Sequence, residues 1–263
     1  MNWIEVNGTS LRYEVSGSGS TTLVMVHEMG GTLDSWDLVL PALNNTRRVL
    51  RYDTRGAGLS EKIHGRVTFD DMADDLAALL DATRLEGKVA VAGTAVGGAI
   101  AIHFAVRHAA RTAALVVTSP ATGVAADRRQ ATLDRANAAE TAGMRGIAEA
   151  SLASSYPPEV RHNAEDFRKF RARWLANDPQ SFAAINRMLA DSTVTEELPR
   201  IACPTLVIGC RHDKLRPPPA VKALADQIPG AEYLEINSGH FAGIQTPGLV
   251  SQAFHGFLFA HGY

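Results

Sequence analysis

The chain has 263 residues, of which 46% are hydrophobic, and this is enough apolar material for a globular core. Its formal net charge is -2, with Lys and Arg scattered among Asp and Glu, so we expect no nucleic-acid partner. The N-terminal segment has no cationic stretch followed by an apolar one, and no apolar run is long enough to span a bilayer. These features predict a cytosolic protein without a membrane partner.

The two cysteines, Cys203 and Cys210, flank one predicted strand. An extended strand would hold them too far apart for a disulfide bond, so we expect buried thiols. No Cys/His spacing resembles a zinc site and no internal repeat is present. The sequence therefore predicts neither a metal nor a cofactor, and no pattern in it indicates an oligomeric state.

The first third of the chain alternates β-prone and helical segments. Residues 2–6 and 10–15 are β-prone and lie on either side of Asn7-Gly8, a dipeptide that favours a type I′ turn, so we expect an antiparallel hairpin. Continuous apolar runs predict buried strands, and apolar residues at helical spacing predict helices. The expected strands are 22–26 and 49–52, and the expected helices are 35–43 and one capped by Thr68 with Phe69, Met72, Leu76, Leu79 and Leu80 on one face.

The most informative stretch is 88–104, which reads KVAVAGTAVGGAIAIHF. An apolar run meets a glycine-flanked turn and a helix-forming run follows directly, so the pattern predicts a strand, a sharp turn and a helix. Small residues are needed where a strand and a helix approach this closely. The residue at the centre of the turn is Ala95, whose methyl group cannot act as a nucleophile.

The rest of the chain separates a helical segment from a second α/β segment. Residues 121–199 are helical in pattern and charged, with breaks at Pro157-Pro158 and Pro179, and we interpret them as an inserted helical cap. The alternation of strands and helices around it predicts a mostly parallel sheet with helices on both faces, and a core made of 1–120 and 200–263. The remaining expected strands are 113–117, 205–208 and 232–236, and the remaining helices are 220–227 and 249–259.

Five separated segments together resemble the α/β-hydrolase family, in the family's own order. VMVHEMGG resembles the oxyanion loop HGxGG, and YDTRGAGLS resembles the turn D-x-R-G-x-G-x-S. GTAVGG resembles the nucleophile elbow, and IGCRHDKLRPP resembles the acid loop. INSGHFAGIQTP resembles the histidine loop, with Gln245 where Glu is common. The resemblance covers the core and implies an α/β-hydrolase fold.

The resemblance implies a role for each matching position. Ala95 occupies the nucleophile position, His240 would be the general base, and Asp213 would orient its ring. Backbone N–H groups of Met29 and Val96 would form the oxyanion hole. No carboxylate follows the strand that ends at 117, so Asp213 has no competitor there.

Other residues are candidates for contact with a small-molecule substrate, namely Glu28, Phe241 and Trp174. Glu28 stands where the family usually has glycine; we favour a solvated loop carboxylate over a contact with the substrate from the rim. Asp53 and Arg55 are expected to stabilise their own turn. The predicted cap also supplies Met188 and a set of arginines that mostly form a solvated helix face, although one of them could bind a substrate carboxylate; these are Arg168, Arg171, Arg173 and Arg187.

Three explanations account for Ala95. Alanine could have been introduced in place of serine, cysteine or aspartate to disable turnover; the chain could be a natural relative that binds a ligand without hydrolysis; or His240 could act as a base without a nucleophile. Loss of a nucleophile costs about 10⁶-fold in kcat, so ordinary ester turnover should be close to absent. We favour the first explanation, with serine as the replaced residue, because Asp213, His240 and the oxyanion loop are all retained.

Within the family, GIQTP after the histidine is similar to the NIEQP-type segment of enol-lactonases and small-ester hydrolases. This similarity implies hydrolysis of a small ester, lactone or enol-lactone. Carbon–carbon bond hydrolases of meta-cleavage type are an alternative; they often carry tryptophan where this chain has Phe241. A non-catalytic ligand-binding protein is the other alternative, since one scaffold of this kind hosts many functions.

Overall fold

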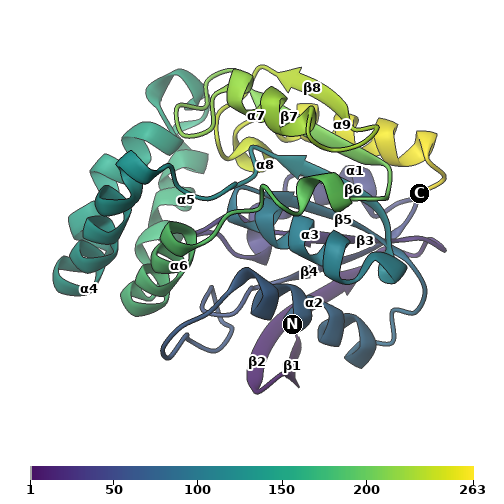
Figure 1. Cartoon of the computed structure of the whole chain (residues 1–263), viewed down its shortest axis with the longest axis horizontal. Helices are drawn as coiled ribbons and strands as arrows, with labels where there is room; N and C mark the ends of the chain where they lie inside the picture. Colours follow the sequence, from purple (N-terminus) through teal and green to yellow (C-terminus); the bar gives the residue numbers. More distant parts are fainter. Residues whose placement is uncertain (1) are drawn as a thin grey trace.

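The computed structural model describes residues 2–263, and its central layer is one eight-stranded sheet (Figure 1). The strand order is β1-β2-β4-β3-β5-β6-β7-β8. β1 and β2 form an antiparallel hairpin, β2 pairs antiparallel with β4, and every later pairing is parallel. The strands are β1 (Asn2–Val6), β2 (Thr9–Ser16), β3 (Thr22–Val26), β4 (Arg48–Tyr52), β5 (Val89–Thr94), β6 (Thr112–Thr118), β7 (Thr205–Cys210) and β8 (Glu232–Ile236). The predicted mostly parallel sheet is confirmed.

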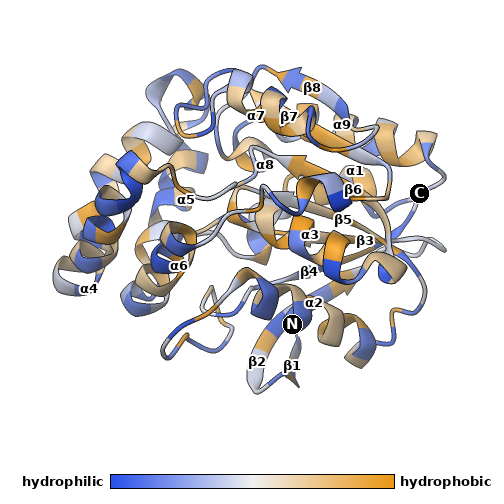
Figure 2. Cartoon of the chain, in the orientation of Figure 1, coloured by the Kyte–Doolittle hydropathy of each residue, from blue (hydrophilic) through white to orange (hydrophobic). Residues whose placement is uncertain are grey.

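Helices cover both faces of this sheet. One hydrophobic cluster joins the sheet to α2, α3 and α7, and a second joins the opposite face to α1 and α9. Figure 2 shows the apolar residues concentrated on the central strands and on the helices beside them. The helices are α1 (Leu40–Leu43), α2 (Phe69–Ala82), α3 (Val96–Arg107), α4 (Ala126–Ser155), α5 (Ala164–Leu175), α6 (Pro179–Asp191), α7 (Pro218–Ala225), α8 (Ala242–Gln245) and α9 (Pro247–Ala260).

The side chains of β3 alternate between the two hydrophobic clusters. Val24 and Val26 pack into the cluster of α2 and α3, whereas Leu23 and Met25 pack into the cluster of α1 and α9. Successive side chains of a strand point to opposite faces, so a strand with helices on both sides must be apolar throughout. All of β3 is buried, as predicted.

The predicted local signals at the first hairpin and at α2 are confirmed. Asn7 and Gly8 both have positive φ, 48° and 70°, which is the requirement of a type I′ turn. Thr68 accepts a hydrogen bond from Asp71 N–H, and the Asp71 carboxylate accepts one from Thr68 N–H. This reciprocal capping box starts α2 where the sequence placed it.

The single helix expected over 35–43 is wrong. The structure has a 3₁₀ turn, η1 (Leu33–Trp36), followed by the short helix α1. Pro41 lacks the N–H that a continuous helix would bond to the carbonyl of Asp37, and its ring disfavours the helical conformation before it. The segment therefore starts two residues earlier, at Leu33, and breaks in the middle.

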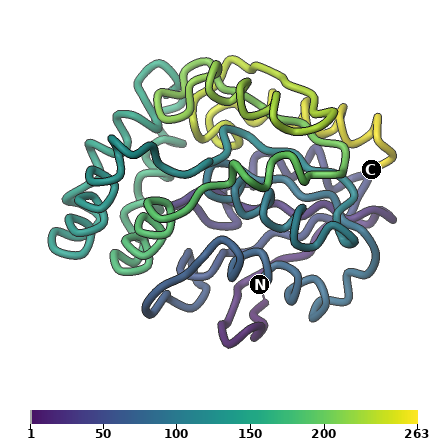
Figure 3. Tube along the Cα trace, viewed as in Figure 1, coloured from purple at the N-terminus to yellow at the C-terminus, as the bar shows by residue number. Residues whose placement is uncertain are grey.

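A helical insert, residues 121–199, separates β6 from β7 and contains α4, α5 and α6 (Figure 3). α4 bends at Gly143, whose φ of 68° and ψ of 175° are not helical, and α6 begins at Pro179, the position predicted as a break. α4 and α6 pack against each other, and a bridge between Gly123 and Thr193 joins the two ends of the insert. The division into a core and a cap at these boundaries stays a prediction.

Both cysteines are free, with Cys210 buried and Cys203 half-buried. Burial raises the pKa of the Cys210 thiol to about 12, so it is an inert core residue. Among the helices of residues 2–263, none combines the length and the apolar content needed to cross a bilayer. The cytosolic location stays a prediction.

Candidate active site

The turn between β5 and α3 holds Ala95 in a conformation that L-residues rarely adopt, with φ 52° and ψ -115°. Its N–H donates to the carbonyl of Thr118 at 3.0 Å, and its carbonyl accepts from Ala121 N–H at 2.8 Å. Such a conformation costs about 1–3 kcal/mol and persists only where neighbours enforce it. The predicted strand, sharp turn and helix are present, and Ala95 lies at the strained position.

The glycines around Ala95 are required by close packing. A Cβ at Gly93 would lie 2.2 Å from the carbonyl oxygen of Gly97, on the helix that follows. A Cβ at Gly97 would lie 2.3 Å from the carbonyl oxygen of Val26 and 2.4 Å from that of His27. Only glycine fits where the helix crosses the ends of two strands this closely. These contacts explain the GTAVGG pattern.

Asp213 and His240 form a buried pair. His240 Nδ1 lies 2.7 Å from Asp213 Oδ2, and the other oxygen of Asp213 accepts from the N–H groups of Leu215 and Arg216 at 2.8 and 2.9 Å. The Asp213 side chain is fully buried. Because Nδ1 carries the proton that faces Asp213, Nε2 is the nitrogen that can accept a proton from another group.

The environment of Asp213 favours its ionised form. Burial disfavours the charge, but the charge and hydrogen bond of His240, together with the backbone N–H of Arg216, outweigh it and hold the pKa of Asp213 below its usual range. An ionised carboxylate here fixes the orientation of the His240 ring.

Ala95, Asp213 and His240 lie at the same edge of the sheet. Ala95 follows β5, Asp213 follows β7 and His240 follows β8. These strands are parallel members of one sheet, so their carboxyl ends share one edge, where ligands bind in open α/β sheets.

The loop after β3 holds the other predicted donor. Gly31 N–H donates to Glu28 carbonyl oxygen at 3.0 Å, which closes a turn around Met29. His27 Nε2 accepts from Thr54 N–H at 3.0 Å, so its Nδ1 carries the proton and donates to the carbonyl of Glu28 at 2.7 Å. Met29 and Val96, the two proposed sources of backbone donors, line one small cavity.

The expectation of a solvated carboxylate at Glu28 is wrong. The side chain is 3% exposed, and Oε1 accepts a hydrogen bond from Ser35 Oγ at 2.9 Å. Gly31 leaves room for it, because a Cβ there would lie 2.4 Å from Oε1. The turn folds the carboxylate back onto η1, so Glu28 supports the loop from inside.

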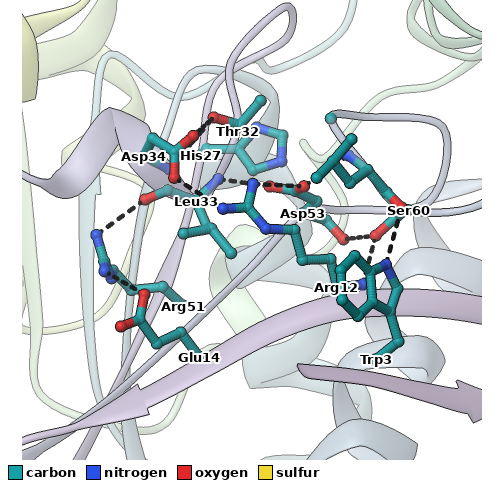
Figure 4. Close-up of polar contacts among 12 residues, drawn as sticks. Trp3, Arg12, Glu14, His27, Thr32, Leu33, Asp34, Arg51, Asp53 and Ser60 are labelled. Atoms are coloured by element: carbon teal, nitrogen blue, oxygen red, sulfur yellow. Dashed lines mark hydrogen bonds and ion pairs between the residues drawn. The ribbon is translucent and has the colours of Figure 1, made fainter. Parts of the chain in front are cut away.

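Asp53 connects the loop after β3 to the loop after β4 (Figure 4). Its two carboxylate oxygens accept from the N–H groups of Leu33 and Leu59 at 2.7 and 2.8 Å, and Arg12 pairs with it at 3.3 Å. Its role extends beyond its own turn, because it also fixes the start of η1. Arg55 instead makes two hydrogen bonds to Asp75 of α2, at 2.9 and 2.7 Å.

The helical insert contacts the loop after β3 through residues that the sequence patterns did not single out, and through Trp174. The buried indole of Trp174 lies over Gly30, where a Cβ would come within 2.7 Å of the ring. Asn177 Nδ2 donates to the Gly30 carbonyl at 2.9 Å, and Asn186 Nδ2 lies 3.7 Å from Met29 Sδ. Asn177 follows a helix and Asn186 lies on the buried face of one, and neither belongs to a sequence motif. Their contacts with the loop after β3 are therefore visible only in the tertiary structure.

Phe241 and Gln245 join the histidine loop to the insert. The Phe241 ring packs against Phe170 and Tyr156, with centroids 4.9 and 6.5 Å away, and against His240 at 5.1 Å. Gln245 Oε1 accepts from Phe241 N–H at 3.2 Å, while its Nε2 donates to Ser155 O at 3.2 Å, at the end of α4. The amide that replaces the more common glutamate thus bridges the two segments.

Most of the other predicted insert residues lie away from this edge. Arg171 pairs with Glu149 at 2.7 Å, Arg187 makes two hydrogen bonds to Glu140, both at 2.7 Å, and Arg168 pairs with Glu165. Arg173 is half-buried at the end of α5. Met188 is buried in the cluster that faces α2 and α3. Within residues 2–263, no three His, Cys, Asp or Glu side chains are grouped to hold a metal ion.

Comparisons with known proteins place this geometry in a family context. The model of the family described as serine aminopeptidase, S33 matches residues 18–237. The chain is 26% identical to 3-oxoadipate enol-lactonase 1 of Acinetobacter baylyi, over 95% of this chain and 94% of that protein. Among solved structures, the enol-lactonase of Burkholderia xenovorans has a TM-score of 0.93 at 27% identity and covers 98% and 100% of the two chains. A thermophilic esterase of Thermogutta terrifontis, solved with malate bound, also has a TM-score of 0.93 at 27% identity, over the whole of both chains.

The strain at residue 95 predicts that Ala95→Gly stabilises the fold. Glycine adopts positive φ without steric cost, and this gain exceeds the entropy it adds to the unfolded chain, so we expect the free energy of unfolding to rise by about 1 kcal/mol. Urea denaturation measures the change. Ala150→Gly, at an exposed position inside α4, is the control and should lower the free energy by about 1 kcal/mol. A loss of stability in Ala95→Gly equal to that of the control would contradict strain at this turn.

The lowered pKa of Asp213 predicts a specific acid sensitivity. The folded-state pKa lies below the unfolded value, so between the two the unfolded chain binds more protons and stability rises with pH. The stability that the ionised Asp213 carboxylate contributes is fully present above about pH 4. It is lost as the pH falls further, through the folded-state pKa of Asp213. Denaturant titrations across the acid range give the free energy of unfolding of the unmodified chain and of Asp213→Asn. This free energy should depend more steeply on pH in the unmodified chain. Parallel curves would contradict this assignment.

Proposed function

The chain belongs to the serine aminopeptidase S33 family and has the α/β-hydrolase fold, and from this premise we propose that it is a serine-type hydrolase of a small ester, lactone or enol-lactone in which alanine replaces the nucleophile. The observation that carries the proposal is the strained turn at Ala95, together with the Asp213–His240 pair at the same edge of the sheet. Backbone strain of this kind clusters at active sites, where it is part of the mechanism.

In the serine form, each group would have one task. The hydroxyl at position 95 would attack the carbonyl carbon while His240 Nε2 takes its proton, and Asp213 would stabilise the imidazolium that forms. The N–H groups of Met29 and Val96 would donate to the developing oxyanion. His240 would then protonate the leaving group, and a water molecule activated by the same nitrogen would release the acyl group.

The chain as it stands would bind its substrate without turning it over. Alanine removes the hydroxyl but leaves the Asp213–His240 pair, the turn around Met29 and the insert in place. Loss of a nucleophile lowers kcat by about 10⁶-fold. We therefore propose that Ala95 substitutes for serine in an otherwise complete site.

Three of the similar proteins support this substrate class. One curated relative and one structural neighbour are enol-lactonases, and another structural neighbour is an esterase. These reactions share attack on an ester carbonyl and the loss of an alcohol or enol, which is the chemistry that the proposed groups perform. Phe241, Tyr156 and Phe170 would provide the apolar wall next to His240.

The test is to restore the hydroxyl. Ala95→Ser should hydrolyse activated aryl esters and enol-lactones at least about 10⁴-fold faster than the chain as it stands, because the hydroxyl, the base and the oxyanion donors act as a unit. Initial rates on a panel of aryl esters, lactones and vinylogous diketones measure the effect. The vinylogous diketones report on carbon–carbon bond cleavage.

Two controls make the test decisive. Ala95→Ser/His240→Ala should fall back to the rate of the unmodified chain, since the hydroxyl is then without its base. Ala95→Thr adds a hydroxyl with an extra methyl group in a crowded turn and should recover much less activity. An inactive Ala95→Ser protein that is folded and still binds ligand would refute the hydrolase proposal in favour of a binding role.

A further inference from the structure

Arg135 of α4 is half-buried and has no carboxylate partner among residues 2–263. Its Nε donates to Asn186 Oδ1 at 2.8 Å, and its two terminal nitrogens have no hydrogen bond to any described residue. Burial, followed by repulsion from Arg216, lowers the pKa of Arg135 from its usual value. A guanidinium that is partly removed from water without a counter-charge is costly and therefore needs an explanation.

Arg216 is a second half-buried guanidinium of this kind. It donates only to carbonyl oxygens, Leu215 O at 3.3 Å and Gly123 O at 3.0 Å. Burial lowers the pKa of Arg216, with the attraction of Asp213 acting in the opposite direction and Arg128 adding to the lowering. Two cations that repel each other have thus been brought together at the junction between the insert and the acid loop.

Both arginines are tied to the groups around Ala95. Arg216 N–H donates to Asp213 Oδ1 at 2.9 Å, so its backbone is part of the support for His240. Arg135 holds Asn186, whose amide lies against Met29 Sδ in the loop after β3. The Arg216 guanidinium lies against Gly123, two residues beyond Ala121, whose N–H binds the carbonyl of Ala95, and the Arg135 guanidinium lies against Asn186 beside Met29.

Two other arginines of the insert have their charge satisfied by carboxylates of the chain itself. Arg171 and Arg187 pair with glutamates at the surface, at 2.7 Å in each case. Exposed pairs of this kind satisfy their own charge and contribute little to stability. No carboxylate among residues 2–263 is hydrogen-bonded to the guanidinium of Arg135 or Arg216, and an anionic ligand would supply that missing partner.

We propose that Arg135 and Arg216 form an anion subsite that binds a carboxylate at the end of the substrate remote from the scissile ester. A carboxylate has two oxygens in one plane and can accept paired hydrogen bonds from a guanidinium, which ammonium groups cannot supply in the same geometry. The inference rests on the proposed function, and it narrows the proposed substrates to monoesters or lactones of dicarboxylic acids. Binding energy from this remote group would orient the ester carbonyl at residue 95.

The test uses matched ligands and the chain as it stands, which binds without turnover. The probes are the monoethyl esters of succinate, adipate and suberate, each compared with the neutral ethyl ester of the same length, namely ethyl butanoate, hexanoate and octanoate. Calorimetric titration gives the dissociation constants. At least one monoester should bind about tenfold or more tightly than its neutral partner, because a charge-assisted hydrogen bond is formed at a partly desolvated site.

The variants Arg135→Gln and Arg216→Gln should each remove most of this preference. Arg187→Gln, which removes a surface arginine from the same insert, should keep the preference. Arg135→Lys and Arg216→Lys retain the charge without the planar fork and should give intermediate values. The lysine variants also preserve the test if an amide destabilises the fold.

Four outcomes decide between these possibilities. The inference is overturned if no monoester binds more tightly than its neutral partner, or if the preference survives both glutamine substitutions. If Ala95→Ser releases ethanol from neutral and acidic esters equally well, the hydrolase function stands and the anion subsite fails. If Ala95→Ser is inactive on every ester but the arginine-dependent binding of the monoesters remains, the subsite stands and the hydrolase function fails.

Discussion

The close approach of α3 to the ends of β3 and β5 is the constraint on which the site depends. The helix begins so near the strands that neither Gly93 nor Gly97 has room for a Cβ, and the chain can pass between them only through a strained residue at 95. The strain directs that side chain away from the sheet, toward the edge where the loops of the other strands converge. A helix that began one turn later would remove both the strain and the site.

The loops around this turn are held by buried polar contacts. Asp53 binds the N–H groups of Leu33 and Leu59, and His27 connects Thr54 to the carbonyl of Glu28. Buried polar groups that are fully hydrogen-bonded rigidify a structure, whereas half-satisfied ones destabilise it. The loop that carries Met29 is therefore preorganised, as a donor for a developing oxyanion must be.

The helical insert closes the site from the other side. Trp174 and Asn177 contact Gly30, and Gln245 binds the end of α4, so both the loop after β3 and the histidine loop are in contact with the insert. A change of position in the insert would be transmitted directly to these loops. The insert thus contributes to the geometry of the site as well as to its cover.

The sequence predicted those parts of the molecule that local rules determine. Glycine spacing placed the turn at Ala95, the Asn7-Gly8 pair placed the hairpin, and Thr68 placed the start of α2. Pro41 prevents the single helix expected over 35–43, because proline lacks the N–H that such a helix needs there. Glu28 was expected in solvent because a carboxylate in a loop usually lies there, and only the folding of the turn onto Ser35 buries it.

Contacts between distant segments could not be predicted in this way. Arg135 and Arg216 lie 81 positions apart, in a helix and in a loop, and no spacing rule relates them; the arginines singled out instead, such as Arg187, pair with surface glutamates. Asn177 and Asn186 are likewise ordinary polar residues until the fold places them against Gly30 and Met29. The proposed substrate recognition depends on these long-range contacts, whereas the proposed catalytic positions lie in local motifs.

A site that lacks only its hydroxyl should activate a serine placed at position 95. The most direct measurement is covalent labelling of Ala95→Ser by an alkyl fluorophosphonate, followed by intact-mass and peptide mass spectrometry. One adduct on residue 95, absent from the chain as it stands and from Ala95→Ser/His240→Ala, is the predicted result. A folded Ala95→Ser protein that forms no adduct, or one that is labelled equally without His240, would contradict a complete hydrolase site around Ala95.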